Sequence, residues 1–172
     1  MAREAMEIGV LVERRKLNSP WADHAWAPVA VLSGAPAAEP WTVLQESAET
    51  TRYFAGAFDL EFFSSDTGTY RDNLRSGLPS LWVSLQETEA PPGIAVQAVT
   101  ADPAEGEALT EPGGAIVEAV PMPREIQERL AAFVAEHHLE RVFHKRKRDR
   151  ADPEALATRA PGERASEADN ER

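Results

Sequence analysis

The chain of 172 residues contains no cysteine. Disulfides, thiolate metal sites, cysteine-ligated clusters and cysteine nucleophiles are therefore excluded. A long uncharged apolar run is also missing, and charged residues interrupt the apolar stretch near the N-terminus too early for a signal peptide. These absences predict a cytoplasmic protein that does not enter a membrane.

Catalytic signatures are missing as well. The sequence has neither a Gly-x-Ser-x-Gly elbow nor the glycine pattern that cradles a phosphate. We therefore predict no catalytic residue and no cofactor, and the pattern favours a non-enzymatic role.

Basic residues are scarce and unevenly placed. The whole chain has 18 Lys and Arg against 29 Asp and Glu, a formal net charge of −11. Residues 1–143 hold 10 of these cations and 22 of the anions, a net charge of −12, whereas residues 144–172 hold 8 and 7, a net charge of +1. An acidic body repels phosphate backbones and acidic lipid, so nucleic-acid binding would depend on the short HKRKR run alone.

The length and the 42% hydrophobic content suit one hydrophobic core. We predict a single α+β domain over residues 1–143, followed by a basic segment and a disordered tail over residues 144–172. The residues after position 150 include almost no large apolar side chain, so they cannot offset the entropy lost on ordering.

One amphipathic helix is predicted near the C-terminal end of this domain. Five residues recur at helical spacing and form one apolar stripe: Ile126, Leu130, Phe133, Val134 and His137. Pro123 suits the first helical turn, and the end of the helix is expected near residues 138–141. The stripe predicts that the helix packs on a hydrophobic core.

Short strands at hairpin spacing precede this helix. They are predicted over residues 7–16, 21–32, 41–45, 52–63, 78–86, 94–99 and 115–120. The first is expected to be a central strand, Pro28 is expected at an edge or bulge, and Gly56 is expected at a bulge. The predicted fold class is α+β: mainly an antiparallel β-sheet or a partly closed barrel, packed against the C-terminal helix.

Several polar groups have two interpretations. His137 with Glu140 could be a metal-binding fragment, although a histidine on an apolar stripe is more often a core residue. An acidic cluster could hold a cation or be a solvated loop containing a single helical turn, and it comprises Asp102, Glu105, Glu107 and Glu111. The four tryptophans are interpreted as core or rim anchors: Trp21, Trp26, Trp41 and Trp82.

Two segments are predicted to contact a partner protein. The polar connection over residues 64–77 reads as a turn-rich loop, and loops commonly carry binding residues. The basic run after the helix contrasts in charge with the body and could bind an acidic partner. The predicted partner-binding residues are Tyr70, Arg71 and Asn73 in the loop and Lys145, Arg146, Lys147 and Arg148 in the run.

Four stretches together resemble a proteobacterial domain-of-unknown-function family, number 3305. They are WADHAWAPVAVLSGAP, YRDNLRSGLPSLWVSL, TADPAEGEAL and the long segment from VEAVPMPREIQ to DPEAL, and the likeness covers about residues 5–157. Members of this family are commonly encoded beside formate dehydrogenase and its maturation factors. The resemblance implies no activity, ligand or catalytic residue, but it implies a role near the assembly of a molybdenum enzyme.

Three functions remain open at this point. The favoured one is a non-enzymatic cytoplasmic accessory or adaptor protein, linked to maturation of a molybdenum-dependent formate dehydrogenase through a subunit or a maturation factor. The first alternative is a small-ligand-binding or hydrolytic barrel with Asp66, Tyr70, Arg71 and Asp102 at its mouth, which would need a deep pocket. The second is nucleic-acid binding through residues 145–150.

Overall fold

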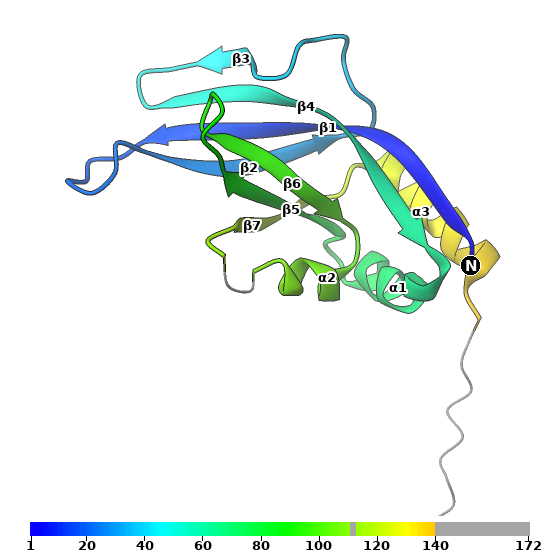
Figure 1. The fold of residues 1–172 in the computed structure, drawn as a ribbon. Coiled ribbons are helices and arrows are strands. Elements are labelled where there is room, and N and C mark those ends of the chain that lie inside the picture. The colour runs from blue at the N-terminus through cyan, green and yellow to red at the C-terminus, as the bar shows by residue number, and fades with distance from the viewer. Residues whose placement is uncertain (111–112, 140–172) are drawn as a thin grey trace, which may run out of the picture. The chain divides into compact units, whose positions relative to one another are not determined.

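The computed structural model describes residues 1–110 and 113–139, which fall within one compact unit, Met1–Leu139 (Figure 1). Its elements are β1 (Arg3–Lys16), β2 (His24–Leu32), β3 (Thr42–Glu46), β4 (Thr50–Phe63), a 3-10 turn (Ser64–Asp66), α1 (Thr67–Arg75), β5 (Ser80–Glu87), β6 (Ile94–Thr100), α2 (Pro103–Ala108), β7 (Ile116–Pro121) and α3 (Arg124–His137). The predicted boundary between residues 143 and 144 lies outside the described residues, so the division into domain and tail stays a prediction.

The first four strands form an antiparallel sheet in the order β2-β1-β4-β3. β1 is central, as its alternating apolar residues predicted. β2 is an edge strand, and its register with β1 shifts between Leu11 and Val12, whose partners are Ala30 and Pro28. Proline cannot donate to a ladder of hydrogen bonds, so an edge strand with a bulge accommodates it. The prediction for Pro28 is confirmed.

A second bulge lies in β4. The register of β1 with β4 shifts between Val10 and Leu11, whose partners are Gly56 and Phe54. Gly56 has φ of +138°, a backbone conformation that side chains disfavour. The predicted bulge at Gly56 is therefore confirmed. Both bulges lie beside the middle of β1, where they increase the bend and twist of the sheet.

The remaining strands form a second antiparallel sheet in the order β6-β5-β7. β5 and β6 form the expected hairpin, and β7 returns along the other side of β5. The two sheets do not close on each other, because each keeps its own edge strands. Of the two predicted architectures, the open antiparallel sheet packed on a helix is the one that forms.

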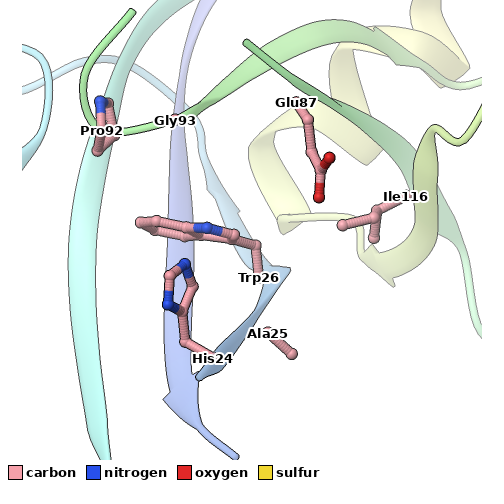
Figure 2. Close-up of a pocket in the computed structure, with 7 residues that line it drawn as sticks. All are labelled: His24, Ala25, Trp26, Glu87, Pro92, Gly93 and Ile116. Carbon is pink, nitrogen blue, oxygen red and sulfur yellow. The ribbon is translucent and has the colours of Figure 1, made fainter. Parts of the chain in front are cut away.

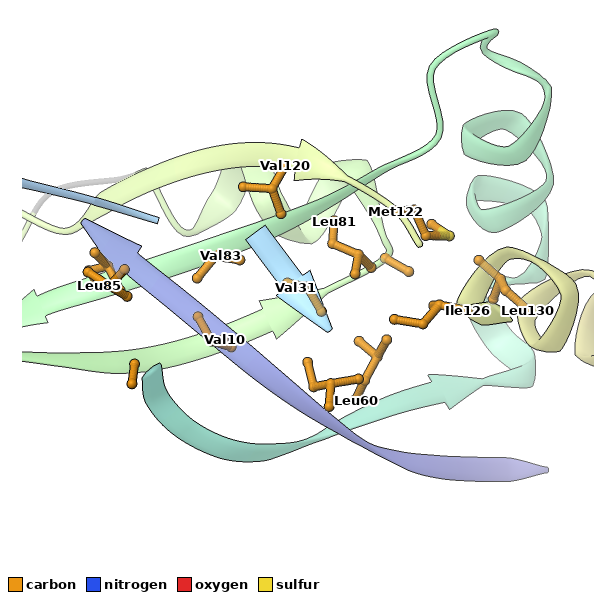
Figure 3. Close-up of a cluster of buried hydrophobic side chains, with 14 of the residues drawn as sticks. Val10, Val31, Leu60, Leu81, Val83, Leu85, Val120, Met122, Ile126 and Leu130 are labelled. Carbon is orange, nitrogen blue, oxygen red and sulfur yellow. The ribbon is translucent and has the colours of Figure 1, made fainter. Parts of the chain in front are cut away.

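One hydrophobic core joins both sheets and α3 (Figure 3). Alternate residues of β5, namely Leu81, Val83 and Leu85, are all fully buried. They belong to the same cluster of buried side chains as Val10 and Leu60 of the first sheet. Burial of this apolar surface is the main stabilising contribution to the fold.

Helix α3 has the predicted stripe. Ile126 and Leu130 are 0% exposed, Phe133 is 2% exposed and Val134 is 9% exposed. The helix begins at Arg124, directly after Pro123, and ends at His137, one residue before the predicted range. The first four residues of the predicted stripe therefore pack on the core as expected, whereas the side chain of His137 is 26% exposed.

The prediction of a loop over residues 64–77 is wrong. Most of this segment forms the 3-10 turn and α1, which buries Thr67, Tyr70 and Asn73.

The prediction of a single helical turn in the acidic segment is confirmed by α2. The side chain of Asp102 caps this helix by accepting a hydrogen bond from the Ala104 amide at 2.9 Å. The described part of the chain thus has three α-helices rather than one.

None of the helices in residues 1–110 and 113–139 combines the length and the apolar character needed to cross a membrane.

Candidate binding site at the hairpin end of the first sheet

The β1–β2 turn and the β3–β4 turn lie together at one end of the four-stranded sheet, which we call the hairpin end. The amide of Lys16 donates to the carbonyl oxygen of Glu49 at 2.8 Å and joins the two turns. Seven large hydrophobic side chains are exposed in the described residues, and four of them belong to these two hairpins: Leu17, Trp21, Val43 and Leu44. Exposed apolar side chains that gather in one region are typical of contact surfaces.

Three aromatic rings pack together on the same sheet. Trp26 of β2 lies 5.8 Å from Trp41 and 5.6 Å from Tyr53, and Trp41 lies 5.9 Å from Tyr53, measured between ring centroids. His24 contacts Trp26 edge-on at 5.7 Å. Contacts between aromatic rings contribute roughly 0.5–1.5 kcal/mol each beyond the area that they bury. The cluster therefore holds the start of β2 against β4.

Arg14 of β1 extends over this aromatic cluster. Its guanidinium carbon lies 5.7 Å from the Trp26 ring and 5.7 Å from the Tyr53 ring. Its neighbour Arg15 instead pairs with Glu13 at 3.6 Å. Among the described residues no carboxylate pairs with Arg14, so its contacts with the aromatic rings determine where the guanidinium sits.

A cavity of about 340 Å³ opens beside Trp26 (Figure 2). Its lining comes from three parts of the chain: His24, Ala25 and Trp26 of β2, Glu87, Pro92 and Gly93 around the β5–β6 turn, and Ile116 of β7. The volume is at the lower end of the range for ligand pockets, which is roughly 300–1,000 Å³. The cavity therefore has room for one long side chain or a small ligand.

The β5–β6 turn that forms one wall depends on glycine. Gly93 has φ of +99°. Its amide donates to the carbonyl oxygen of Ala90 at 2.8 Å, and its own carbonyl oxygen accepts from the Thr88 amide at 3.0 Å. A residue with a side chain would be strained in this left-handed conformation. The turn therefore places Pro92 at the cavity in a defined position.

The ionisable groups of the cavity are few. Glu87 supplies a carboxylate, His24 supplies an imidazole, and the remaining wall is aromatic or apolar. In Figure 2 the Glu87 carboxylate points into the space between Trp26 and Ile116. This composition suits a ligand with a polar group for Glu87 and an apolar part for Trp26 and Ile116, in a cavity that is open to solvent.

The predicted loop residues lie elsewhere, and two of them are buried. Tyr70 is 2% exposed and Asn73 is 4% exposed. The Asn73 side-chain amide donates to the carbonyl oxygens of Ser80 at 2.8 Å and Ala101 at 2.9 Å. The prediction that Tyr70 and Asn73 are on an exposed loop is therefore wrong, and neither is positioned to contact a partner at the surface.

Arg71 is engaged within the fold. Its guanidinium Nη1 lies 3.0 Å from Nε2 of His138, and Nδ1 of His138 lies 3.1 Å from the hydroxyl of Thr67. A guanidinium can only donate, so Nε2 must accept and the imidazole hydrogen must be on Nδ1, which donates to Thr67. These two bonds fasten the residue after α3 to α1.

The two sheets are open, so the residues predicted to line the mouth of a barrel do not form such a mouth. Asp102 is 8% exposed, and its side chain caps α2. The hydroxyl of Thr100 donates to the Glu105 carboxylate at 2.7 Å. The acidic segment therefore has structural contacts at Asp102 and Glu105, whereas Glu111 lies outside the described residues.

The part of the chain that the structure describes contains no arranged set of metal ligands. No group of three or more His, Asp or Glu side chains there is placed to hold an ion. The ring of His137 packs on Phe133 at 4.6 Å, but its side chain is 26% exposed, so this histidine lies at the edge of the core rather than within it. Glu140, its predicted fellow ligand, lies outside the described residues, and so do Lys145, Arg146, Lys147 and Arg148.

The tryptophans occupy different environments. Trp26 is 8% exposed and belongs to the core, whereas Trp21 is 92% exposed and packs against no core residue among those described.

The cavity beside Trp26 was not predicted from the sequence. The Pro-Pro-Gly turn was a visible signal, but nothing in the spacing of residues predicts that this turn lies over the start of β2.

A comparison with protein families identifies the family of this chain. Residues 7–147 match the family model described as Protein of unknown function (DUF3305). The chain belongs to this family. The match covers β1 from Glu7 onward and every later element of the described residues. The cavity and most of the hairpin end are therefore parts of a DUF3305 domain, and the resemblance noted from the sequence is confirmed at the level of the family. No curated protein and no solved structure gives a significant match.

Proposed function

We propose that the protein is a non-enzymatic accessory or adaptor protein of the cytoplasm that acts by binding another protein through its hairpin end. The observation that supports this proposal is the concentration of exposed apolar side chains there, above all Trp21 at 92% exposure. Large aromatic side chains commonly supply most of the binding energy in protein interfaces.

The edge strand β3 adds to this surface. It is the outermost strand of its sheet, all five of its residues are exposed, and Val43 and Leu44 are each 49% exposed. Its register with β4 shifts between Val43 and Gln45, so Leu44 lies at a bulge. A bulge on an edge strand disfavours pairing with another strand, so we expect the partner to contact side chains rather than to extend the sheet.

The partner that we propose is a subunit or a maturation factor of a molybdenum-dependent formate dehydrogenase. This part of the proposal rests on family resemblance, because family members are commonly encoded beside such genes.

Small-ligand binding is a second candidate function, and the observation that favours it is the cavity of about 340 Å³ beside Trp26.

Co-purification tests the main proposal. The tagged full-length protein, purified from cells that make the dehydrogenase, should retain a dehydrogenase subunit or a maturation factor. The double variant Trp21→Ala, Leu44→Ala should retain at least about tenfold less, because loss of two interface anchors costs more than the 1.4 kcal/mol that a tenfold change requires.

Leu78→Ala is the matched control. Leu78 is 71% exposed and lies between α1 and β5, outside the hairpin end. This variant should retain the partner as the unmodified protein does. Absence of any enriched partner, together with full dehydrogenase activity in cells that lack the protein, would refute the proposal.

A further inference from the structure

The carboxylate of Glu87 is the starting point for a more specific assignment. Glu87 is the last residue of β5, is exposed to solvent and lines the cavity beside Trp26. It forms no ion pair and no side-chain hydrogen bond with any described residue, although the carboxylates of Glu13, Glu4 and Glu61 on the first sheet all pair with arginines. Glu87 therefore keeps its full capacity to accept hydrogen bonds from a ligand.

The wall opposite Glu87 suits a cation with an alkyl stem. Trp26 presents an indole ring, and Ile116 and Pro92 supply apolar surface (Figure 2). Arginine and lysine lay their methylene groups along such surface while the charged head reaches a polar partner. The same indole already accommodates the guanidinium of Arg14 at 5.7 Å, so the ring is in an environment compatible with this type of contact.

The charges around the cavity favour a cation further. Glu87 is the single carboxylate in the lining, and Glu89 follows it in the same turn. Arg14 contacts Trp26 but is not part of the lining, and His24 is the one basic group that is. Residues 1–143 have a net charge of −12, so the long-range field of the body attracts a cationic partner.

We propose that this cavity binds a single basic side chain, arginine or lysine, that the protein partner presents, with its cationic head on Glu87 and its alkyl stem between Trp26 and Ile116. This inference rests on the proposed function, because it assumes a protein partner. The cavity volume of about 340 Å³ suits one long side chain.

Nuclear magnetic resonance of the purified full-length protein tests the proposal without the partner. The probes are a blocked leucine–arginine–leucine tripeptide, its citrulline analogue, which has nearly the same shape but no charge, and agmatine. The arginine peptide should shift the indole N–H signal of Trp26 and the amide signal of Gly93. The citrulline peptide should bind about three- to fivefold more weakly, because it lacks the charge-assisted hydrogen bond to the exposed Glu87 carboxylate.

Two variants separate the cavity from the general acidity of the surface. Glu87→Gln should weaken binding of the arginine peptide about three- to fivefold, because an ion pair that is exposed to solvent is weak. Glu89→Gln removes the same charge two residues away, and it should change binding by less than about twofold because Glu89 does not line the cavity and cannot contact the bound side chain directly.

Equal binding of the arginine and citrulline peptides, equal binding by Glu87→Gln, or signal shifts away from Trp26 would overturn the assignment. Agmatine binding as tightly as the peptide would overturn the part that gives the site to a protein segment, because a free amine would then be sufficient. Co-purification depends on Trp21 and Leu44, which do not line the cavity, so the two proposals can fail separately.

Discussion

Tyr70 is the residue whose environment differs most from what its neighbours in the sequence suggest. Its ring packs between Phe62 at 5.9 Å and Phe133 at 6.5 Å, and its hydroxyl oxygen accepts a hydrogen bond from the Phe63 amide at 3.2 Å. Burial raises the pKa of Tyr70 to about 12. This value already includes the hydrogen bond from the Phe63 amide, which lowers the pKa, and smaller increases from the carboxylates of Asp66, Asp102 and Glu105.

The raised pKa makes stability depend on alkaline pH. An unfolded tyrosine titrates near pH 10, whereas folded Tyr70 titrates at about 12, so the folded state holds this proton more tightly. The resulting stabilisation is fully present below pH 10 and is lost as the pH rises from 10 to 12.

Replacing Tyr70 by phenylalanine should therefore have a pH-dependent effect. At pH 8, Tyr70→Phe should lower the free energy of unfolding by about 1–2 kcal/mol, because the half-buried Phe63 amide loses its acceptor. At pH 11 the difference from the unmodified protein should shrink by about 1 kcal/mol. Urea unfolding at both pH values measures this change.

Leu130→Ala is the control for the alkaline experiment. It removes a fully buried side chain but no ionisable group, so its cost of about 2–5 kcal/mol should be the same at both pH values. A Tyr70→Phe difference that is equally large at pH 8 and pH 11 would contradict the assigned cause.

Asn73 explains why polar residues of this segment could not be placed from the sequence. Its side-chain oxygen accepts from the Ser80 amide at 3.0 Å, and its side-chain nitrogen donates to Ser80 and Ala101. Ala101 is 28 residues away along the chain. Spacing within the segment indicates turn chemistry, but it has no information about partners at such a distance.

At the scale of elements, α2 is held against β5 by a contact that only glycine permits. A Cβ atom on Gly106 would lie 2.3 Å from Cγ of Trp82 and 2.8 Å from its Cβ. A rotation of the Trp82 side chain would not remove this clash, because its Cβ and Cγ atoms are fixed close to its own backbone. Gly68 of α1 differs, because a Cβ atom there would meet nothing within 4 Å.

Glycine-to-alanine substitutions at these two positions should have opposite effects. Gly68→Ala should raise the free energy of unfolding by about 0.5–1 kcal/mol, because alanine is the better helix former. Gly106→Ala should lower it by at least about 1–3 kcal/mol, because the added methyl group displaces Trp82 or α2. Thermal unfolding of the two single variants measures both effects, and a stabilising Gly106→Ala would refute the contact.

The predictability of each element follows from what it buries. β5 and α3 bury apolar side chains at regular intervals, so their periodicity was visible in the sequence. Helix α1 was missed because two of its three buried residues, Thr67 and Asn73, are polar and satisfy their hydrogen bonds inside the fold. A hydrophobic stripe is then too short to be recognised.

At the scale of the whole molecule, both sheets and α3 share one core, so they should unfold together. Leu85→Ala in β5 removes a side chain that is 0% exposed and should cost about 2–5 kcal/mol. Tryptophan fluorescence and far-ultraviolet circular dichroism should report the same shifted transition. Two separate transitions would contradict a common core.

The candidate site could not be predicted because it exists only at this largest scale. His24 and Trp26 come from an early strand, Glu87 and Pro92 from a hairpin in the middle of the chain, and Ile116 from a later strand. The strands that carry or flank these residues were each predicted. The approach of the second sheet to the start of β2 depends on packing, which residue spacing does not encode.

The pairing of β1 with β4 sets the order in which the chain can fold. Arg3 lies opposite Phe63, and the amide of Ser64 donates to the carbonyl oxygen of Ala2 at 3.0 Å, so this contact closes a loop of about 60 residues. The β1–β2 and β3–β4 hairpins close much shorter loops and can form first. Non-local pairing slows folding. One edge of β1 can therefore pair with β2 early in synthesis, whereas its other edge stays incompletely paired until the chain has been synthesised up to Phe63.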